Sequence, residues 1–188
     1  MLNEIEIHIQ PTPNPNALKF ILNTPVLNEG KATFASPEEA ANLQIAKDLF
    51  QLNGIRELHL FDNYITVTFH DDKNSSQLRD EICAVIKTRM PVNDVNFQSK
   101  PTVQSRPVFE SPELQRIQEI LDNTVRSYLQ SDGGDLEIIS YNEKVLTIRY
   151  QGACGSCPSS VYGTLNAIQS ILQDEFDPDI VVELADSF

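Results

Sequence analysis

Cys154 and Cys157 are the residues of this chain whose type and spacing best suit metal binding or redox chemistry. They lie three positions apart in Gly152–Ser160, a run of small residues that we call the cysteine loop and that the pattern predicts to open a helix. Thiolates at this spacing can bind one soft metal centre, because a loop can direct both sulfurs the same way. The unpaired N–H groups and the dipole at the helix start favour thiolate over thiol. The loop therefore predicts a metal or redox site.

The number of available ligands limits the kind of site. A structural zinc ion or an iron–sulfur cluster usually needs four protein ligands, and the cysteine loop supplies two. The remaining cysteine, Cys83, lies in the other half of the chain, in a predicted helix with an apolar face. A four-thiolate site is therefore most simply built from two chains around one cluster on a two-fold axis. The isolated histidines on or near predicted strands are expected to be structural or solvated: His8, His59 and His70.

Two other interpretations of the cysteine pair stay open. A dithiol–disulfide oxidoreductase also places Cys-x-x-Cys at a helix start after a strand. Against it, the chain has no tryptophan, and the predicted element order does not suggest a parallel strand–helix–strand unit leading into the motif. The other alternative is a zinc site of four cysteines that serves only to join two chains.

The charge is strongly acidic and unevenly distributed. The 188 residues contain 14 Lys and Arg against 27 Asp and Glu, a net charge of −13. This excludes nucleic acid and anionic membranes as expected partners, because both bind clustered basic residues. Residues 1–104 have 9 basic and 13 acidic side chains, net −4, and residues 105–188 have 5 and 14, net −9. Two acidic halves would repel each other, so we expect a salt-sensitive dimer that depends on its bound cluster.

Composition places the chain among ordinary globular proteins. Apolar residues make up 40% and charged residues 22%. Three cysteines are too few for a secreted disulfide scaffold, which favours a reducing compartment. The start, residues 1–9, alternates apolar and polar side chains and does not resemble a leader. We therefore expect a cytoplasmic protein, or the mature form of an organellar one.

The stretch 98–111 contains two prolines and three serines, which predicts a flexible linker, residues 98–110, between domains 1–97 and 111–188. Turn residues and hydrophobic periodicity predict the order strand, strand, helix, strand, strand, helix, strand for the first domain. Its predicted strands are residues 4–10, 18–22, 55–61, 64–69 and 92–97, and the strands 55–61 and 64–69 are expected to form a hairpin around Asp62-Asn63. Its predicted helices begin at Ser36 and close to Leu78.

The second domain is expected to begin with a helix capped by Ser111. Asp132–Asp135 (Asp-Gly-Gly-Asp) predicts the end of this helix, because glycine readily adopts the left-handed conformation found there. We favour this helix stop over an alternative in which the acidic side chains act near the cysteine loop. Tyr128 and Tyr162 are expected to be packing residues. The predicted helix buries one face, made of Leu114, Ile117, Leu121, Val125 and Tyr128.

Strands at residues 136–140, 145–150 and 180–184, with a helix after the cysteine loop, complete the second domain. The fold class predicted for the whole chain is α+β. Each of the two small domains is expected to pack helices on a mostly antiparallel sheet.

Several motifs together resemble a known family. Leu129–Asp135 (Leu-Gln-Ser-Asp-Gly-Gly-Asp) and Gln151–Ser160 (Gln-Gly-Ala-Cys-Gly-Ser-Cys-Pro-Ser-Ser) resemble the C-terminal domain of NifU, also called the Nfu domain. Pro11–Phe20 and Tyr64–Thr68 are similar to the Nfu N-terminal domain. Where many relatives have Arg-Pro, this chain has Arg126-Ser127, which is expected only to alter the end of the helix.

The resemblance implies a function and a set of ligands. Nfu proteins are iron–sulfur cluster scaffolds or carriers and not enzymes, so no catalytic residue is expected. The resemblance implies that Cys154 and Cys157 of two subunits hold a [4Fe–4S] cluster in a homodimer, with [2Fe–2S] as the other form. The implied partners are upstream cluster-assembly proteins and apo iron–sulfur client proteins. The family's N-terminal domain carries no cluster, so no ligand role passes to Cys83.

Overall fold

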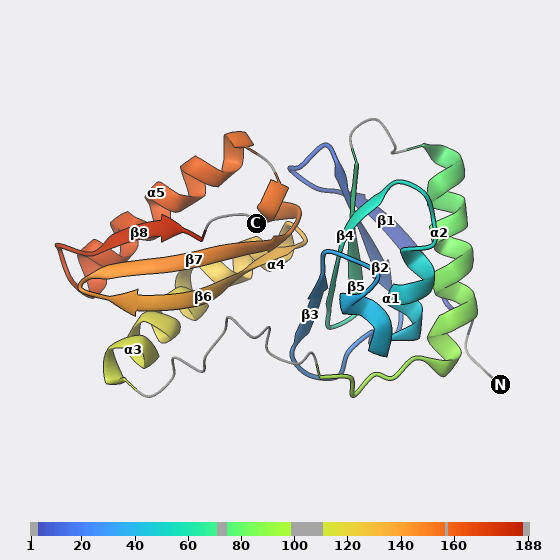
Figure 1. The fold of residues 1–188 in the computed structure, drawn as a ribbon, viewed down its shortest axis with the longest axis horizontal. Helices are drawn as coiled ribbons and strands as arrows, with labels where there is room; N and C mark the ends of the chain where they lie inside the picture. Colours follow the sequence, from blue (N-terminus) through green and yellow to red (C-terminus); the bar gives the residue numbers. More distant parts are fainter. Residues whose placement is uncertain (1–3, 71–74, 99–110, 157, 186–188) are drawn as a thin grey trace. The chain divides into compact units, whose positions relative to one another are not determined.

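A computed structural model describes residues 4–70, 75–98, 111–156 and 158–185. The chain divides into two compact units, unit 1 (Met1–Ser99) and unit 2 (Lys100–Phe188). Figure 1 shows that each unit combines a β-sheet with helices, which confirms the predicted α+β class. Nearly all of the predicted linker, residues 98–110, lies outside the described residues. None of the helices in the described ranges is long and apolar enough to span a membrane.

Unit 1 contains a five-stranded antiparallel sheet in the order β1-β2-β5-β4-β3. The predicted hairpin between its fourth and fifth strands is confirmed, and Asp62 adopts a positive φ of 47° in the tight turn. The strands are β1 (Ile7–Pro11), β2 (Ala17–Leu22), β3 (Lys31–Phe34), β4 (Ile55–Phe61) and β5 (Tyr64–Phe69).

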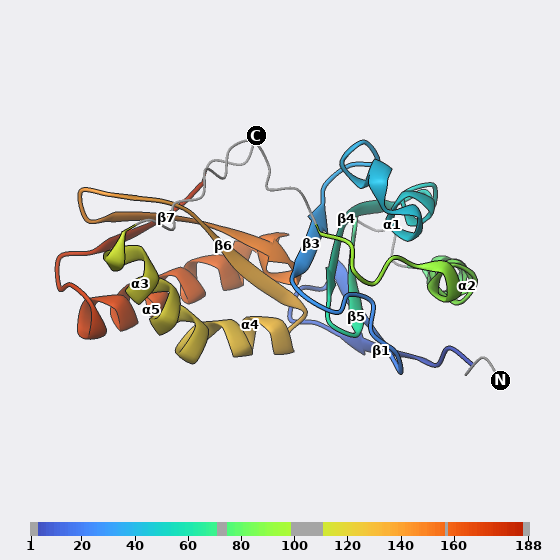
Figure 2. The same ribbon diagram turned by 90° about the horizontal axis from the view of Figure 1, so that it is seen from below.

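Two helices, α1 (Gln44–Leu49) and α2 (Ser76–Arg89), cover one face of this sheet (Figure 2). Ser75 caps the start of α2, because its hydroxyl accepts a hydrogen bond of 3.1 Å from Leu78 N. Alternate residues of the strands pack with the helices in one apolar core, which includes Phe20, Leu58, Ile65, Val67, Ile82 and Ile86.

Three predictions for unit 1 are wrong in detail. The four-residue strand β3 is missing from the prediction because it is too short to show alternation. The helix expected from Ser36 is a 3-10 helix, Glu39–Asn42, followed by the short α1, because the extended Leu43 (φ −125°) interrupts it. Residues 92–97 form no strand, since Met90–Val92 is a 3-10 helix and a turn follows it. The closely spaced Asn93, Asp94 and Asn96 favour turns over a strand.

Unit 2 contains a three-stranded sheet in the order β6-β7-β8. β6 (Gly134–Asn142) and β7 (Val145–Gly152) are antiparallel, whereas β7 and β8 (Val181–Leu184) are parallel. The long helix α5 (Pro158–Glu175) makes the crossover between β7 and β8. The cysteine loop therefore lies between a strand and the helix of a parallel β-α-β unit, which the element order did not suggest.

The other helices of unit 2 are α3 (Pro112–Leu121) and α4 (Ser127–Ser131), joined by a π-helical segment, Asp122–Arg126. Figure 2 shows α3, α4 and α5 on one face of the sheet. A π turn holds one more residue than an α turn, so it rotates the residues that follow. Leu129 is consequently buried in place of Tyr128, which is 74% exposed. Tyr162 is 69% exposed, so the packing role predicted for both tyrosines is wrong.

Candidate metal centre

Cys154 lies in a 3-10 helix, Ala153–Ser156, directly after β7. Its side chain is half-buried and packs against the apolar core of unit 2. The helix α5 begins at Pro158, the position where a missing N–H has little effect. Cys157, the second predicted ligand, lies outside the described residues, so its place in the site stays a prediction.

Glycines from two separate segments surround Cys154. Gly133 (φ 82°) and Gly152 (φ 65°) have the left-handed backbone that favours glycine. Gly134 starts β6 and pairs with Gly152 across the sheet. The Ala153 N–H donates a hydrogen bond of 3.2 Å to the Gly133 carbonyl, which ties the helix stop to the turn that carries Cys154.

Gly134 is required for space rather than for its backbone angle. A Cβ atom at this position would lie 2.4 Å from Cys154 Sγ and 2.8 Å from the Gln151 carbonyl oxygen. Both distances are far shorter than contacts between such atoms, so any side chain at position 134 would displace the sulfur or the β7 backbone. The sulfur of Cys154 is therefore seated against the main chain of β6.

This contact extends the interpretation of Asp132–Asp135. The predicted helix stop is confirmed, because Asp132 N donates to Tyr128 O and Gly133 has the left-handed conformation. Ending the helix requires only Gly133, however, and the second glycine, Gly134, provides the seat, the surface against which the Cys154 sulfur lies. A pair of adjacent glycines, where one is sufficient, is the signal in the sequence that points to this seat.

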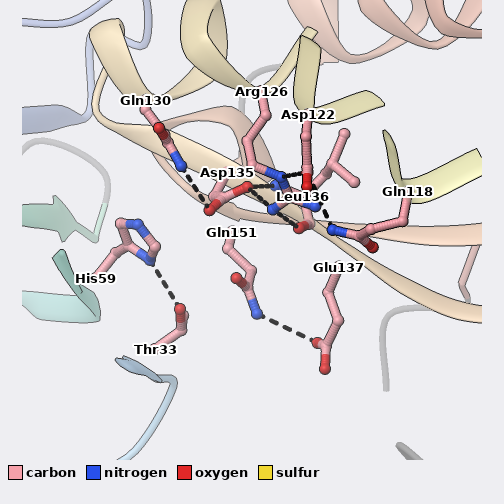
Figure 3. A network of polar contacts seen from close by, with 10 residues as sticks. All are labelled: Thr33, His59, Gln118, Asp122, Arg126, Gln130, Asp135, Leu136, Glu137 and Gln151. Atoms are coloured by element: carbon pink, nitrogen blue, oxygen red, sulfur yellow. Dashed lines mark hydrogen bonds and ion pairs between the residues drawn. The ribbon is translucent and has the colours of Figure 1, made fainter. Parts of the chain in front are cut away.

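The last residue of that motif, Asp135, is 1% exposed and anchors the start of β6. Its carboxylate accepts a hydrogen bond of 2.5 Å from Arg126 Nη1 and one of 2.6 Å from Leu136 N (Figure 3). The same Arg126 nitrogen also donates to the Leu136 carbonyl, at 3.0 Å. The Arg126 guanidinium therefore neutralises the buried Asp135 carboxylate and holds the start of β6, which includes Gly134, in place.

The π-helical segment places Arg126 for this contact. Arg126 Nε also donates to Asp122 Oδ1, at 2.6 Å, and Asp122 accepts a further hydrogen bond of 3.0 Å from Gln118 (Figure 3). A series of hydrogen bonds thus connects Gln118 on α3, through Asp122 and Arg126, to Asp135. Arg126 was noted in the sequence only for the residue that follows it, and its pairing with Asp135 depends on the fold.

Tyr150, four residues before Cys154, is a buried tyrosine of β7, 8% exposed and part of the unit 2 core. None of the described residues offers a hydrogen-bond partner to its hydroxyl. Burial and, after it, the negative charge of Cys154 raise the pKa of this phenol. Tyr150 is therefore a protonated donor at neutral pH.

The other sulfur- and nitrogen-bearing candidates do not join this site. Cys83 lies on α2 in unit 1, and burial, followed by the charge of Asp80, raises the pKa of its thiol. His59 is buried and its Nδ1 lies 2.8 Å from the Thr33 hydroxyl. The structural or solvated role predicted for the histidines is confirmed, since the other two are exposed on unit 1: His8 and His70.

Within the described parts of the chain, no group of three or more His, Cys, Asp or Glu side chains is arranged to hold a metal ion. The sulfur of Cys154 lies directly against the main chain of β6 at Gly134, and Tyr150, whose hydroxyl can donate a proton, belongs to the same apolar cluster.

Comparison with known proteins shows the family to which the chain belongs. The family model described as "Scaffold protein Nfu/NifU N terminal" matches residues 7–93, and the model described as "NifU-like domain" matches residues 117–183. The chain therefore belongs to the Nfu/NifU family of scaffold proteins.

Curated relatives give the same family. The chain is 33% identical over 170 residues to "NFU1 iron-sulfur cluster scaffold homolog, mitochondrial" of Drosophila persimilis, which covers 89% of this chain and 60% of the relative. The human protein of the same name is 31% identical over 169 residues, 89% of this chain and 66% of the relative. This chain thus spans about three fifths of the length of the first relatives.

Among solved structures, a NifU-like protein from Saccharomyces cerevisiae matches 52% of this chain and 87% of its own, with 21% identity and a TM-score of 0.45.

Proposed function

We propose that this chain is an iron–sulfur cluster scaffold or carrier. Cys154 and Cys157 of two chains bind one cluster as cargo, and the cluster then passes to apo-proteins. The names of the relatives, iron–sulfur cluster scaffold homologs, support this function. The observation that carries it is the seat of Cys154, where Gly134 allows the sulfur to lie directly against the main chain of β6.

The count of cysteines supports a site shared by two chains. A [4Fe–4S] cluster takes four thiolate ligands, and the whole chain has three cysteines. Cys83 belongs to unit 1 and packs in its core, so each chain offers the Cys154–Cys157 pair. The proposed loaded form is a homodimer with one [4Fe–4S] cluster between the subunits, and a [2Fe–2S] cluster is the other form that the same ligands accept.

Delivery proceeds by exchange of thiolates and needs no redox partner. Each step forms one bond between iron and a client cysteine and breaks one bond between iron and Cys154 or Cys157. The released thiolate takes up a proton from solvent. The half-buried Cys154 suits such exchange, because a client thiolate can reach a sulfur that is not fully buried. Proposed partners are therefore apo iron–sulfur proteins downstream and cluster-assembly proteins upstream.

The acidity of residues 105–188, net −9, acts against the dimer. Bringing two such halves together around an anionic cluster costs electrostatic free energy, which salt reduces. The apo-protein is therefore expected to dissociate at low salt. The relatives are mitochondrial by name, and we propose a reducing compartment for this chain too, either the cytoplasm or an organelle.

Anaerobic reconstitution with ferrous iron and sulfide tests the function. The loaded protein should be brown, should contain about four iron atoms per two chains, and should have twice the mass of the apo form by light scattering. Cys157→Ala should take up no cluster, whereas Cys83→Ala, the matched control, should load normally. A cluster that survives Cys157→Ala, or one carried by a monomer, would contradict the proposal.

A dithiol oxidoreductase is the second candidate, and one feature favours it. The cysteine pair lies between β7 and α5 of a parallel β-α-β unit, which is also where redox-active pairs occur. This function predicts a reversible disulfide between Cys154 and Cys157, turnover of a model disulfide and no bound iron. Metal analysis and a visible spectrum of protein purified without air separate iron–sulfur, zinc and dithiol forms.

A further inference from the structure

The hydroxyl of Tyr150 occupies an unfavourable place in the apo-protein. The ring lies in the core of unit 2, on the same face of β7 as Leu146 and Ile148, and Leu136 lies opposite on β6. The side chain is 8% exposed, and no partner for its oxygen occurs among the residues that the structure describes. A buried hydroxyl without a partner destabilises the folded state, and a phenylalanine would fill the same space without this disadvantage.

The position of Tyr150 relative to Cys154 suggests what the hydroxyl is for. Both side chains pack in the same apolar cluster, and burial and, after it, a negative charge on Cys154 raise the pKa of the Tyr150 phenol. Gly134 seats this sulfur from the β6 side. The phenol and the glycine thus both belong to the surroundings of one sulfur.

We propose that Tyr150 donates a hydrogen bond to a sulfur of the bound cluster on the Cys154 side, either the Cys154 thiolate or the neighbouring inorganic sulfide. This inference rests on the proposed function. The phenol has one proton to donate, and thiolate and sulfide sulfurs are acceptors without protons when iron is bound. The hydroxyl that lacks a partner in the apo-protein gains one when the cluster arrives.

Such a bond has two consequences for the cargo. Hydrogen bonds to sulfur withdraw electron density from the cluster, which raises its reduction potential. They also slow the escape of the ligand, because release of the cluster returns Tyr150 to its unpartnered state. Tyr150 therefore adjusts how tightly the chain holds its cargo, in addition to the two thiolates.

The variant Tyr150→Phe separates this role from a structural one, because the two predict opposite signs. It removes one oxygen and leaves the ring. If the hydroxyl serves the cluster, the apo-protein keeps or gains thermal stability, and the loaded protein loses cluster about three- to tenfold faster, the effect expected for one typical hydrogen bond. The potential of the loaded variant should also be lower than that of wild type.

The experiment measures apo melting temperature, rate of cluster loss to a chelator, and reduction potential for wild type, Tyr150→Phe and Tyr141→Phe. Tyr141 is the matched control, because it lies on β6 of the same unit with its ring against Phe176. Tyr141→Phe should leave cluster retention and potential unchanged. Loading with Zn²⁺ alone, which brings no inorganic sulfide, identifies the acceptor. Faster zinc loss from Tyr150→Phe assigns it to the Cys154 thiolate, and an effect confined to the iron–sulfur form assigns it to sulfide.

Two results would overturn the inference while leaving the proposed function intact. One is a loaded Tyr150→Phe with the retention and potential of wild type. The other is a clear fall in apo stability, which would mean that the hydroxyl already has a partner without the cluster. Wild-type protein that takes up no cluster at all would overturn both proposals.

Discussion

Cys83 and Cys154 have the same functional group in contrasting surroundings. Cys83 projects from the middle of α2 against the core of unit 1, and burial together with Asp80 raises the pKa of its thiol. Cys154 lies on a short turn after β7, and its sulfur lies against the main chain of β6 because position 134 has no side chain. On α2, Cys83 packs its side chain against the core of unit 1. On the turn after β7, the Cys154 sulfur is positioned by the main chain at Gly134. The comparison teaches that the backbone around a cysteine, rather than its burial alone, makes it a candidate ligand.

The largest expected difference is in metal uptake. Cys154→Ala should abolish cluster binding, because the site loses one thiolate from each of the two chains. Cys83→Ala should leave the iron content per chain unchanged after reconstitution. Iron analysis of both variants, with circular dichroism to establish that they fold, measures the contrast. Loss of iron from Cys83→Ala would show that unit 1 contributes to the site after all.

The second prediction concerns Arg126, the cation that pairs with Asp135 at the start of β6. Arg126→Met leaves the Asp135 carboxylate buried without its partner, and breaking such a pair costs about 3–5 kcal/mol. The urea midpoint of unit 2 should fall accordingly, and that of unit 1 should not change. Adding Asp135→Asn should restore part of the loss, because the neutral amide no longer requires a cation. A single variant as stable as wild type would mean that the pair does not anchor β6.

A smaller effect distinguishes two glycines of unit 2. Gly134→Ala places a Cβ atom 2.4 Å from Cys154 Sγ, and overpacking of this kind typically costs about 1–3 kcal/mol and should weaken cluster binding. Gly163→Ala meets nothing within 4 Å and should stabilise α5 by about 0.5–1 kcal/mol. Thermal melts and cluster retention test both variants. Equal effects from the two substitutions would contradict the role assigned to Gly134.

The smallest effect concerns an ion pair at the surface of unit 2. Lys144 Nζ lies 3.2 Å from an Asp177 oxygen and 2.8 Å from an Asp179 oxygen. A backbone hydrogen bond from Asp179 and then Lys144 lower the pKa of Asp177, while both aspartates raise the pKa of Lys144. Lys144→Met should therefore lower the melting temperature slightly at neutral pH and leave cluster binding intact.

The pH dependence of that difference has a definite sign. A lowered carboxyl pKa gives stability that is present above the ordinary value of 3.8 and is lost as the pH falls through the lower folded value. The raised lysine pKa gives stability that persists up to 10.5 and is lost at higher pH. Melts of wild type and Lys144→Met should converge at both extremes. A constant difference from acid to alkali would mean that Lys144 contributes through packing.

Local patterns predicted much of the architecture. The sequence predicts Ser111 as a helix cap, and its hydroxyl accepts the expected hydrogen bond from Leu114 N. The β4–β5 hairpin and the left-handed Gly133 followed from turn residues. The errors occur where local signals are weak or shift. The π-helical segment changed the phase between Val125 and Leu129, and β3 was too short for alternation to show.

The sequence by itself determined the chemistry on offer: a Cys-x-x-Cys pair at a helix start, three thiols in all, and an acidic second half. Only the tertiary structure decided what surrounds Cys154. Gly134 lies twenty positions earlier in the chain, and it meets the sulfur because β6 and β7 pair in one particular register. The contacts of Arg126 with Asp135, and the burial of Tyr150, depend on the same packing. Periodicity and spacing describe neighbours along the chain, whereas a binding site is made by neighbours in space.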